Sequence, residues 1–173
     1  MYADTARKLA DVLVRHEIEL VYGGADKGIM GVLADAVLEQ GGKVHGVIPQ
    51  MLLEKEIAHE GLTELHVVNS MHDRKTMMAA LSDGFIALPG GYGTLEEIIE
   101  IITWGQLRFH EKPCGLLNVE GYFDHLLAWV GHAFEEGFLR RENRDMLLVD
   151  ADPVGLVQKF ERYTAPQVGK WMS

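Results

Sequence analysis

The sequence Leu88-Pro89-Gly90-Gly91-Tyr92-Gly93-Thr94-Leu95-Glu96-Glu97 joins a short apolar run to a long helical pattern. The apolar residues 85–88 predict a buried strand, and residues 95–107 predict an amphipathic helix. The glycines allow a tight turn, and Thr94 followed by Glu97 matches a capping box, with Thr94 as the N-cap. A glycine turn that leads into a helix N-terminus favours an anion, because backbone amides point at it.

Strand and helix patterns alternate on both sides of this turn. Short, continuously apolar strands indicate a parallel sheet with helices on both faces. We predict an α/β fold, a Rossmann-like doubly wound parallel sheet in three layers. A single nucleotide-binding domain is expected over residues 1–164 and a loose tail over 165–173. The predicted strands are 18–22, 44–48, 65–68, 85–88, 113–117 and 146–149, and the predicted helices are 2–16, 28–40, 70–81, 95–107, 122–136 and 153–163.

Composition limits the partners of this chain. Its 173 residues carry 16 Lys and Arg against 26 Asp and Glu, a net charge of −10, which argues against binding nucleic acid. A small anionic ligand remains compatible with local donors. A single cysteine, Cys114, excludes an internal disulfide and favours a cytoplasmic location. No apolar run approaches the ~18 residues of a membrane span, so we expect no membrane association.

Glycine and basic side chains follow the predicted strands. Ligands of such sheets bind beyond the carboxyl ends of the strands. Gly23, Gly24 and Gly28 either hold a phosphate or only allow tight turns and close helix packing. Arg74 and Lys75 lie in the first turn of a helix, where the macrodipole favours an anion among them. The alternative is an exposed pair that bridges to Asp73 or Glu60.

The helix after the turn raises two further questions. Glu97 either caps this helix or takes part in chemistry. Its core-facing stripe is predicted to contain Leu95, Ile98, Ile99 and Ile102. Ile101 and Trp104 are then expected on the solvent flank with Glu97, which suggests that a second subunit covers them. The alternative is that another segment of the same chain does so.

Other reactive side chains lack a recognisable setting. The eight histidines show no H-E-x-x-H or comparable spacing, so we expect no metal site. Cys114 is expected to be buried filler rather than a nucleophile. Tyr92 stacks on a base or covers the turn, and the sequence does not separate these roles.

Together, five motifs resemble one known family. They are Pro89-Gly90-Gly91-Tyr92-Gly93-Thr94-Leu95-Glu96-Glu97, Val21-Tyr22-Gly23-Gly24, Gly28-Ile29-Met30-Gly31, Gly46-Val47-Ile48-Pro49 and Met71-His72-Asp73-Arg74-Lys75. The chain resembles the Lonely Guy (LOG) family of cytokinin riboside 5′-monophosphate phosphoribohydrolases over residues 3–162. Members were often labelled lysine decarboxylases, an activity that the resemblance does not support.

The resemblance implies an N-glycosyl hydrolase without a cofactor. Its substrates would be cytokinin riboside 5′-monophosphates and AMP. The enzyme would cleave each of them to free base and ribose 5-phosphate. Arg74 and Glu97 match the catalytic pair. The family implies a homodimer, here through the helix face from Glu97 to Trp104. Positions that match substrate contacts are Glu56, Lys75, Gly90, Gly91, Tyr92, Gly93, Thr94, Leu95, Glu96 and Thr103.

Family members usually begin with a strand and a Gly-Ser-Ser turn, whereas this sequence begins with a helical pattern at Tyr2. The first strand is therefore either missing from the sheet or not contained in this sequence. Two alternatives to the hydrolase stay open. One is a nucleotide-binding protein without catalysis. The other is a pyridoxal-phosphate-dependent lysine decarboxylase, which needs a Schiff-base lysine. Lys75 is the only lysine expected near the site.

Overall fold

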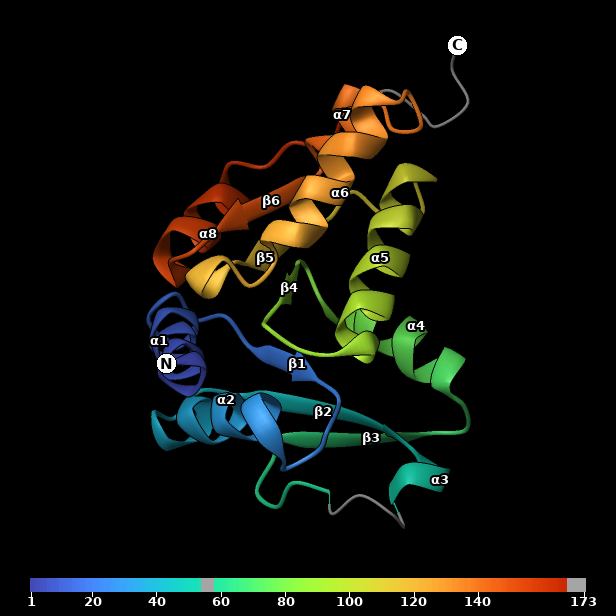
Figure 1. Cartoon of the computed structure of the whole chain (residues 1–173). Coiled ribbons are helices and arrows are strands. Elements are labelled where there is room, and N and C mark those ends of the chain that lie inside the picture. The colour runs from blue at the N-terminus through green and yellow to red at the C-terminus, as the bar shows by residue number, and fades with distance from the viewer. Residues whose placement is uncertain (54–57, 168–173) are drawn as a thin grey trace. The chain divides into compact units, whose positions relative to one another are not determined.

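The computed structural model describes residues 1–53 and 58–167. The chain divides into two compact units, Met1–Ser82 and Asp83–Ser173. The strands within each unit are parallel and alternate with helices, which confirms the predicted α/β class (Figure 1). The six strands form two three-stranded sheets, ordered β1-β2-β3 and β4-β5-β6. Each unit thus contains one three-stranded parallel sheet whose strands are connected by helices.

The first unit contains three strands and four helices among its described residues. Its sheet pairs Leu20 with Val44 and His45 with Glu64, and α1 packs on α2. The buried face of α1 contains Leu9, Val12 and Leu13, as its periodicity predicts. The elements are α1 (Tyr2–Arg15), β1 (Leu20–Tyr22), α2 (Gly28–Glu39), β2 (Val44–Pro49), α3 (Gln50–Leu53), β3 (Glu64–Val68) and α4 (Met71–Leu81).

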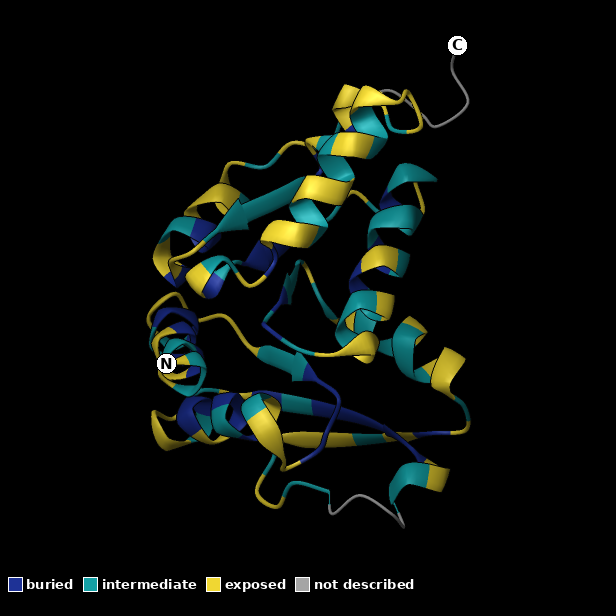
Figure 2. Ribbon diagram, viewed as in Figure 1, coloured by how far each residue is buried: buried dark blue, intermediate teal, exposed yellow. Residues whose placement is uncertain are grey.

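The second unit has a more completely buried central strand. All four residues of β5 are buried, and α8 packs on β5 and β6 (Figure 2). The short helix α7 was not predicted. The elements are β4 (Phe85–Ala87), α5 (Tyr92–Gln106), β5 (Cys114–Leu117), the 3-10 helix η1 (Val119–Gly121), α6 (Asp124–Glu135), α7 (Arg141–Arg144), β6 (Leu147–Asp150) and α8 (Pro153–Glu161).

Two predictions about α5 are wrong. Ile99 is exposed rather than part of the core stripe, and Ile101 is buried at 8% exposure rather than facing solvent. The buried residues of α5 are Ile98, Ile101 and Gly105, which recur at intervals of three and four. Trp104 is half-buried. Burial of Ile101 within the chain is the alternative that the sequence left open, so this residue gives no support to a dimer.

Among residues 1–53 and 58–167, no helix has the length and apolar character needed to cross a bilayer. Of the predicted tail, residues 165–167 are described and follow α8 without regular secondary structure. The remainder, 168–173, lies outside the described residues.

Candidate active site

The helix α4 begins as the sequence predicts. Ser70 is its N-cap, and the Ser70 hydroxyl oxygen accepts the Asp73 amide at 3.0 Å. The same hydroxyl donates to the Asp73 carboxylate at 2.8 Å. This cap fixes the first turn of the helix, which ends with Arg74, and Lys75 follows directly. Both side chains are half-buried.

Arg74 extends from α4 toward β1 and β2. Its Nε donates to the Val47 carbonyl at 3.2 Å, near the carboxyl end of β2. Its guanidinium also lies where a side chain at Gly23 would begin, directly after β1. A residue with a Cβ at position 23 would displace that guanidinium. Gly23 is therefore required by the close approach of Arg74.

The other glycines of this segment have backbone reasons of their own. Gly24 and Gly28 adopt φ values of +79° and +67°, a region that side chains strongly disfavour. The tight turns that the sequence offered as one explanation are therefore present. Gly28 is the first residue of α2, and the preceding N-cap, Lys27, makes no side-chain cap. Anion binding by this loop stays a prediction.

His59, which no sequence motif indicated, binds the same loop. The backbone amide of His59 donates to the Gly24 carbonyl at 3.1 Å. Its Nε2 lies 2.9 Å from Asp35 Oδ1 on α2. Burial, followed by the charges of Asp35 and Asp26, raises the pKa of Tyr22 at the end of β1. Tyr22 therefore stays a neutral phenol at physiological pH.

The glycine turn of the second unit differs from its prediction. The helix α5 begins at Tyr92 with Gly91 as N-cap, not at Leu95 with Thr94 as N-cap. The flexible glycines let the helix start three residues earlier, which places Thr94 inside its first turn. The capping-box interpretation of Thr94 and Glu97 is therefore wrong. Glu97 lies in the second turn and is half-buried.

The start of α5 retains the features that favour an anion. Gly91 has no side chain to cap the first amides, and the first turn holds no acidic residue. Thr94 Oγ1 packs where a Cβ at Gly90 would lie. Tyr122 donates its hydroxyl to the Gly90 carbonyl at 2.7 Å, which ties the turn to the segment before α6.

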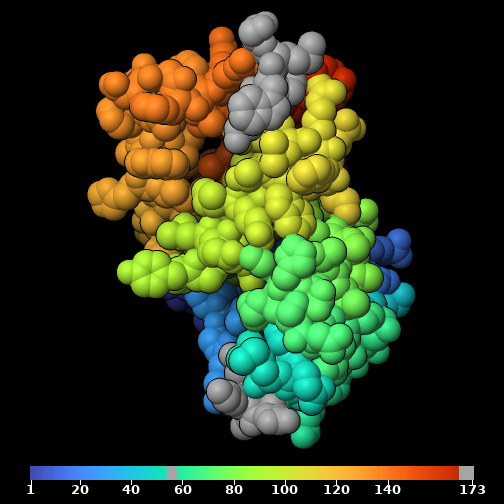
Figure 3. Space-filling view, turned by 90° about the vertical axis from the view of Figure 1, so that its right-hand side faces the viewer, coloured from blue at the N-terminus to red at the C-terminus, as the bar shows by residue number. Residues whose placement is uncertain are grey.

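The remaining predicted residues of α5 vary in exposure. Tyr92 is 95% exposed, and the yellow-green turn and first residues of α5 lie at the surface in Figure 3. Gly93 and Glu96 are also exposed, whereas Leu95 is half-buried. Thr103 donates its hydroxyl to the Ile99 carbonyl of the same helix at 2.8 Å. Glu56 lies outside the described residues.

Cys114 is excluded as a nucleophile by its surroundings. It is buried in β5, and burial raises the pKa of its thiol to about 12. The thiolate is the reactive species, so this cysteine is inert at physiological pH.

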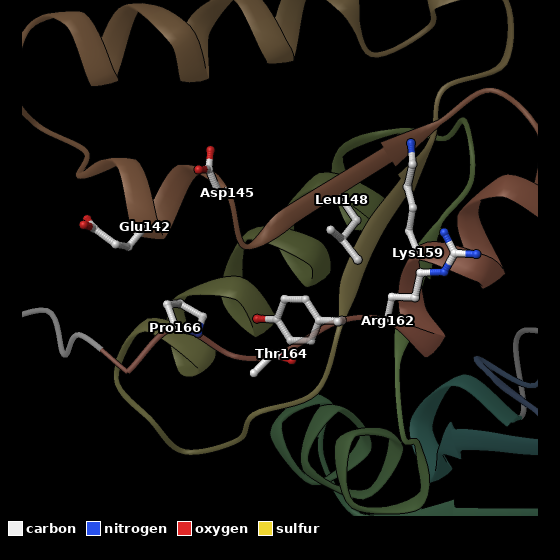
Figure 4. A pocket seen from close by; sticks show the side chains of 8 residues that line it. Glu142, Asp145, Leu148, Lys159, Arg162, Thr164 and Pro166 are labelled. Atoms are coloured by element: carbon white, nitrogen blue, oxygen red, sulfur yellow. The ribbon is translucent and has the colours of Figure 1, made fainter.

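A separate pocket of about 470 Å³ lies in the second unit. Figure 4 shows the acidic side chains of Glu142 and Asp145 on one side of it and the basic side chains of Lys159 and Arg162 on the other. None of the residues predicted for the site lines it. No motif in the sequence indicated this pocket.

One group among the described residues has the composition of a metal site. His45, Glu64 and His66 each offer a ligand atom within 4.8 Å of the other two. No H-E-x-x-H spacing is involved, because β2 and β3 supply these residues separately. The sequence alone did not predict that these two strands pair.

Comparison with known proteins assigns the chain to a family. The family model "Possible lysine decarboxylase" matches residues 30–160. A cytokinin riboside 5′-monophosphate phosphoribohydrolase of Arabidopsis thaliana is 49% identical over 94% of this chain and 71% of its own length. A second Arabidopsis protein of the same name is 49% identical over 94% of this chain and 76% of its own length. The chain belongs to the LOG family.

Two solved structures share the fold of this chain. A molybdenum cofactor binding protein from Rippkaea orientalis is 18% identical, with a TM-score of 0.69 over 93% of this chain and 86% of that one. The molybdenum cofactor carrier protein of Chlamydomonas reinhardtii is 20% identical, with the same TM-score and coverage. At these identities the likeness concerns the fold alone.

Proposed function

We propose that this chain hydrolyses the N-glycosidic bond of cytokinin riboside 5′-monophosphates, and of AMP, to free base and ribose 5-phosphate. The observation that carries the proposal is 49% identity, over 94% of the chain, to two Arabidopsis proteins named for this reaction. The glycine turns and the uncapped start of α5 are compatible with a phosphorylated substrate.

Glu97 is proposed as the catalytic carboxylate. Cleavage of a ribosyl bond passes through an oxocarbenium-like state, which a nearby carboxylate stabilises. The water oxygen bonds to C1′ while the C1′–N bond breaks and its electron pair leaves with the base. Glu97 accepts a proton from the water and later returns it to the solvent, while the departing base takes up one proton from the solvent. Glu97 does not cap α5, because Gly91 is the N-cap of that helix.

Arg74 is proposed to neutralise the negative charge of the phosphate or of the departing base. Its half-buried position and its bond to the Val47 carbonyl hold the guanidinium in place, and fixed charges are effective in electrostatic catalysis. The amides at the starts of α2 and α5, at Gly28 and Gly91, are proposed phosphate donors. Arg74 belongs to the first unit and Glu97 to the second.

The remaining predicted contacts complete the proposed substrate site. We place Glu56, Lys75, Thr103 and residues 90–96 at the substrate, and Gly23 and Gly24 at its phosphate. No cofactor is required by this chemistry. We further propose a cytoplasmic homodimer that uses the α5 face from Glu97 to Trp104. The half-buried Trp104, which shares this side of α5 with Glu97, supports that face.

Product analysis tests the proposal. The purified protein is incubated with AMP and with isopentenyladenosine monophosphate, and the mixture is separated by chromatography. We expect free base from at least one nucleotide. Binding of both nucleotides without release of base would instead favour a nucleotide-binding protein. Sedimentation velocity of the wild type and of Trp104→Ala tests the dimer, which the variant should weaken.

A further inference from the structure

Two histidines and two glutamates gather on one face of the sheet of the first unit. His45 and Glu64 are direct partners of β2 and β3, and His66 follows Glu64 by two residues. Alternation along a strand places Glu64 and His66 on the same face. Glu19, just before β1, completes the group. These residues lie near the amino ends of the strands, whereas the proposed phosphate loops follow the carboxyl ends.

The nitrogen atoms of both rings are directed at one carboxylate. Glu64 Oε2 lies 3.6 Å from His45 Nδ1 and 3.4 Å from His66 Nε2. His66 Nε2 is buried and has no hydrogen-bond partner among the described residues. An unsatisfied buried nitrogen is costly unless something binds it. A cation between these three groups removes that cost.

The second nitrogen of His45 is held as metal-bound histidines usually are. His45 Nε2 lies 2.7 Å from Glu19 Oε2. A carboxylate on the far nitrogen fixes the ring and its tautomer, and leaves the near nitrogen with a lone pair for a metal. Glu19 is itself fixed by Lys43, whose Nζ lies 2.7 Å from Glu19 Oε1.

We infer that His45 Nδ1, Glu64 and His66 Nε2 form a site for a divalent transition cation of the Zn²⁺ class, with Glu19 as the outer partner of His45. Two imidazoles and one carboxylate are a frequent ligand set for zinc. Ligands about 2.0–2.1 Å from a tetrahedral zinc lie roughly 3.3 Å apart, close to the 3.6 and 3.4 Å separations from Glu64 Oε2 to the two rings.

Charge and access are also suitable. The carboxylates of Glu19 and Glu64 outnumber the one nearby ammonium of Lys43. The Glu64 side chain is 58% exposed, whereas those of His45 and His66 are 17% and 21% exposed. A cation therefore reaches the site from the Glu64 side and keeps a fourth position for water. Bound there, it joins the amino ends of β2 and β3.

Cobalt titration tests the inference without any assay of activity. Tag-free protein is stripped with a chelator, exchanged into metal-free buffer and titrated with Co²⁺ while its visible absorption is recorded. We expect saturation at about one equivalent per chain, with tetrahedral absorption bands that Zn²⁺ abolishes. Zn²⁺ should also raise the Tm, because it binds only the folded state.

Four variants locate the site. His66→Ala and Glu64→Gln should lose at least about 10-fold in Co²⁺ affinity, and Glu19→Gln about 10- to 100-fold. His132→Ala, an exposed histidine of α6, should bind as the wild type does. Circular dichroism checks each fold. If His66→Ala fails to fold, Glu64→Gln decides, because its exposed side chain is not needed for packing.

Two results would overturn the inference. One is the absence of saturable binding near one equivalent. The other is wild-type Co²⁺ affinity in Glu64→Gln together with wild-type Co²⁺ affinity in His66→Ala, if His66→Ala folds.

Discussion

The guanidinium of Arg74 occupies the space in which a side chain at Gly23 would begin. This relationship couples the glycine turn after β1 to the first turn of α4. It also gives Gly23 a function in positioning, because the hydrogen bond from Arg74 Nε to the Val47 carbonyl holds the side chain over that turn. The glycine motif and the arginine motif are therefore parts of one arrangement.

Gly23→Ala should impair turnover far more than stability. The added Cβ meets the far end of a flexible side chain, so Arg74 can move aside and the free energy of unfolding should change by less than about 1 kcal/mol. Misplacement of a catalytic group costs on the order of 100-fold in rate. Steady-state kinetics and urea unfolding check both values.

Gly131→Ala is the matched control for Gly23→Ala. A Cβ at Gly131 in α6 meets nothing within 4 Å, so this variant should keep its activity and gain a little stability. Full activity in Gly23→Ala would contradict the positioning role.

Glu97→Gln should separate chemistry from structure. Glu97→Gln leaves the Gly91 cap of α5 in place and keeps the size of the side chain, so the variant should stay folded by circular dichroism. Loss of a general base should lower kcat by about 100- to 10,000-fold. Single-turnover kinetics measure this. Glu100→Gln, one turn along α5, is the control and should stay active.

Gly90 and Thr94 should be energetically coupled. A Cβ at Gly90 overlaps Thr94 Oγ1, so Gly90→Ala should destabilise the protein by about 1–3 kcal/mol. Adding Thr94→Ala removes the hydroxyl and should recover part of this loss, a coupling of about 0.5–3 kcal/mol in a double-mutant cycle. Urea unfolding gives the four values. If the two changes in the free energy of unfolding were strictly additive, Thr94 would not pack against Gly90.

The same cycle with Thr103→Ala provides its control. Thr103 lies nine residues further along α5 and donates to the Ile99 carbonyl of its own helix. The changes that Thr103→Ala and Gly90→Ala cause in the free energy of unfolding should add, because distant sites share no contacts.

Stability at low pH should depend on Asp150. Its Oδ2 lies 2.9 Å from Lys159 Nζ, and its Oδ1 accepts the Asp152 amide at 2.9 Å. The Lys159 hydrogen bond, followed by the backbone amide of Asp152, holds the pKa of Asp150 below its usual range. This stabilisation is complete above the unfolded pKa of about 3.9 and is lost as pH falls through the lower folded pKa.

Asp150→Asn should therefore lower the free energy of unfolding by about 1 kcal/mol at neutral pH, and this difference from the wild type should shrink in acid. Urea unfolding across pH measures it. Asp145→Asn, which breaks only exposed ion pairs, should change stability by less than about 0.5 kcal/mol at any pH. A deficit in Asp150→Asn that persisted in strong acid would exclude the ion pair as its cause.

The sequence predicted the elements of the fold better than their contacts. Hydrophobic periodicity placed every strand and the long helices, because each pattern is local. It misplaced the start of α5, because glycines permit a helix to begin where no capping side chain exists. Ile99 and Ile101 were assigned to the wrong faces of α5, since a shift of one residue rotates a helix by about 100°.

Long-range relationships were beyond the sequence. The approach of Arg74 to Gly23 joins residues 51 positions apart, and the grouping of His45 with His66 depends on the register of β2 and β3. Spacing rules detect ligands within one helix or loop, so they missed a set divided between strands. Local sequence patterns likewise do not indicate whether the substrate carries a prenyl group.

Hydrolysis by this chain is expected to depend on the 5′-phosphate of the substrate. The most direct measurement compares base release from isopentenyladenosine monophosphate with release from the same nucleoside without phosphate, under single-turnover conditions. We expect the monophosphate to yield free base and ribose 5-phosphate in equal amounts, at least about 100-fold faster than the nucleoside reacts. Recovery of both compounds intact, or equal rates for the two, would contradict the account.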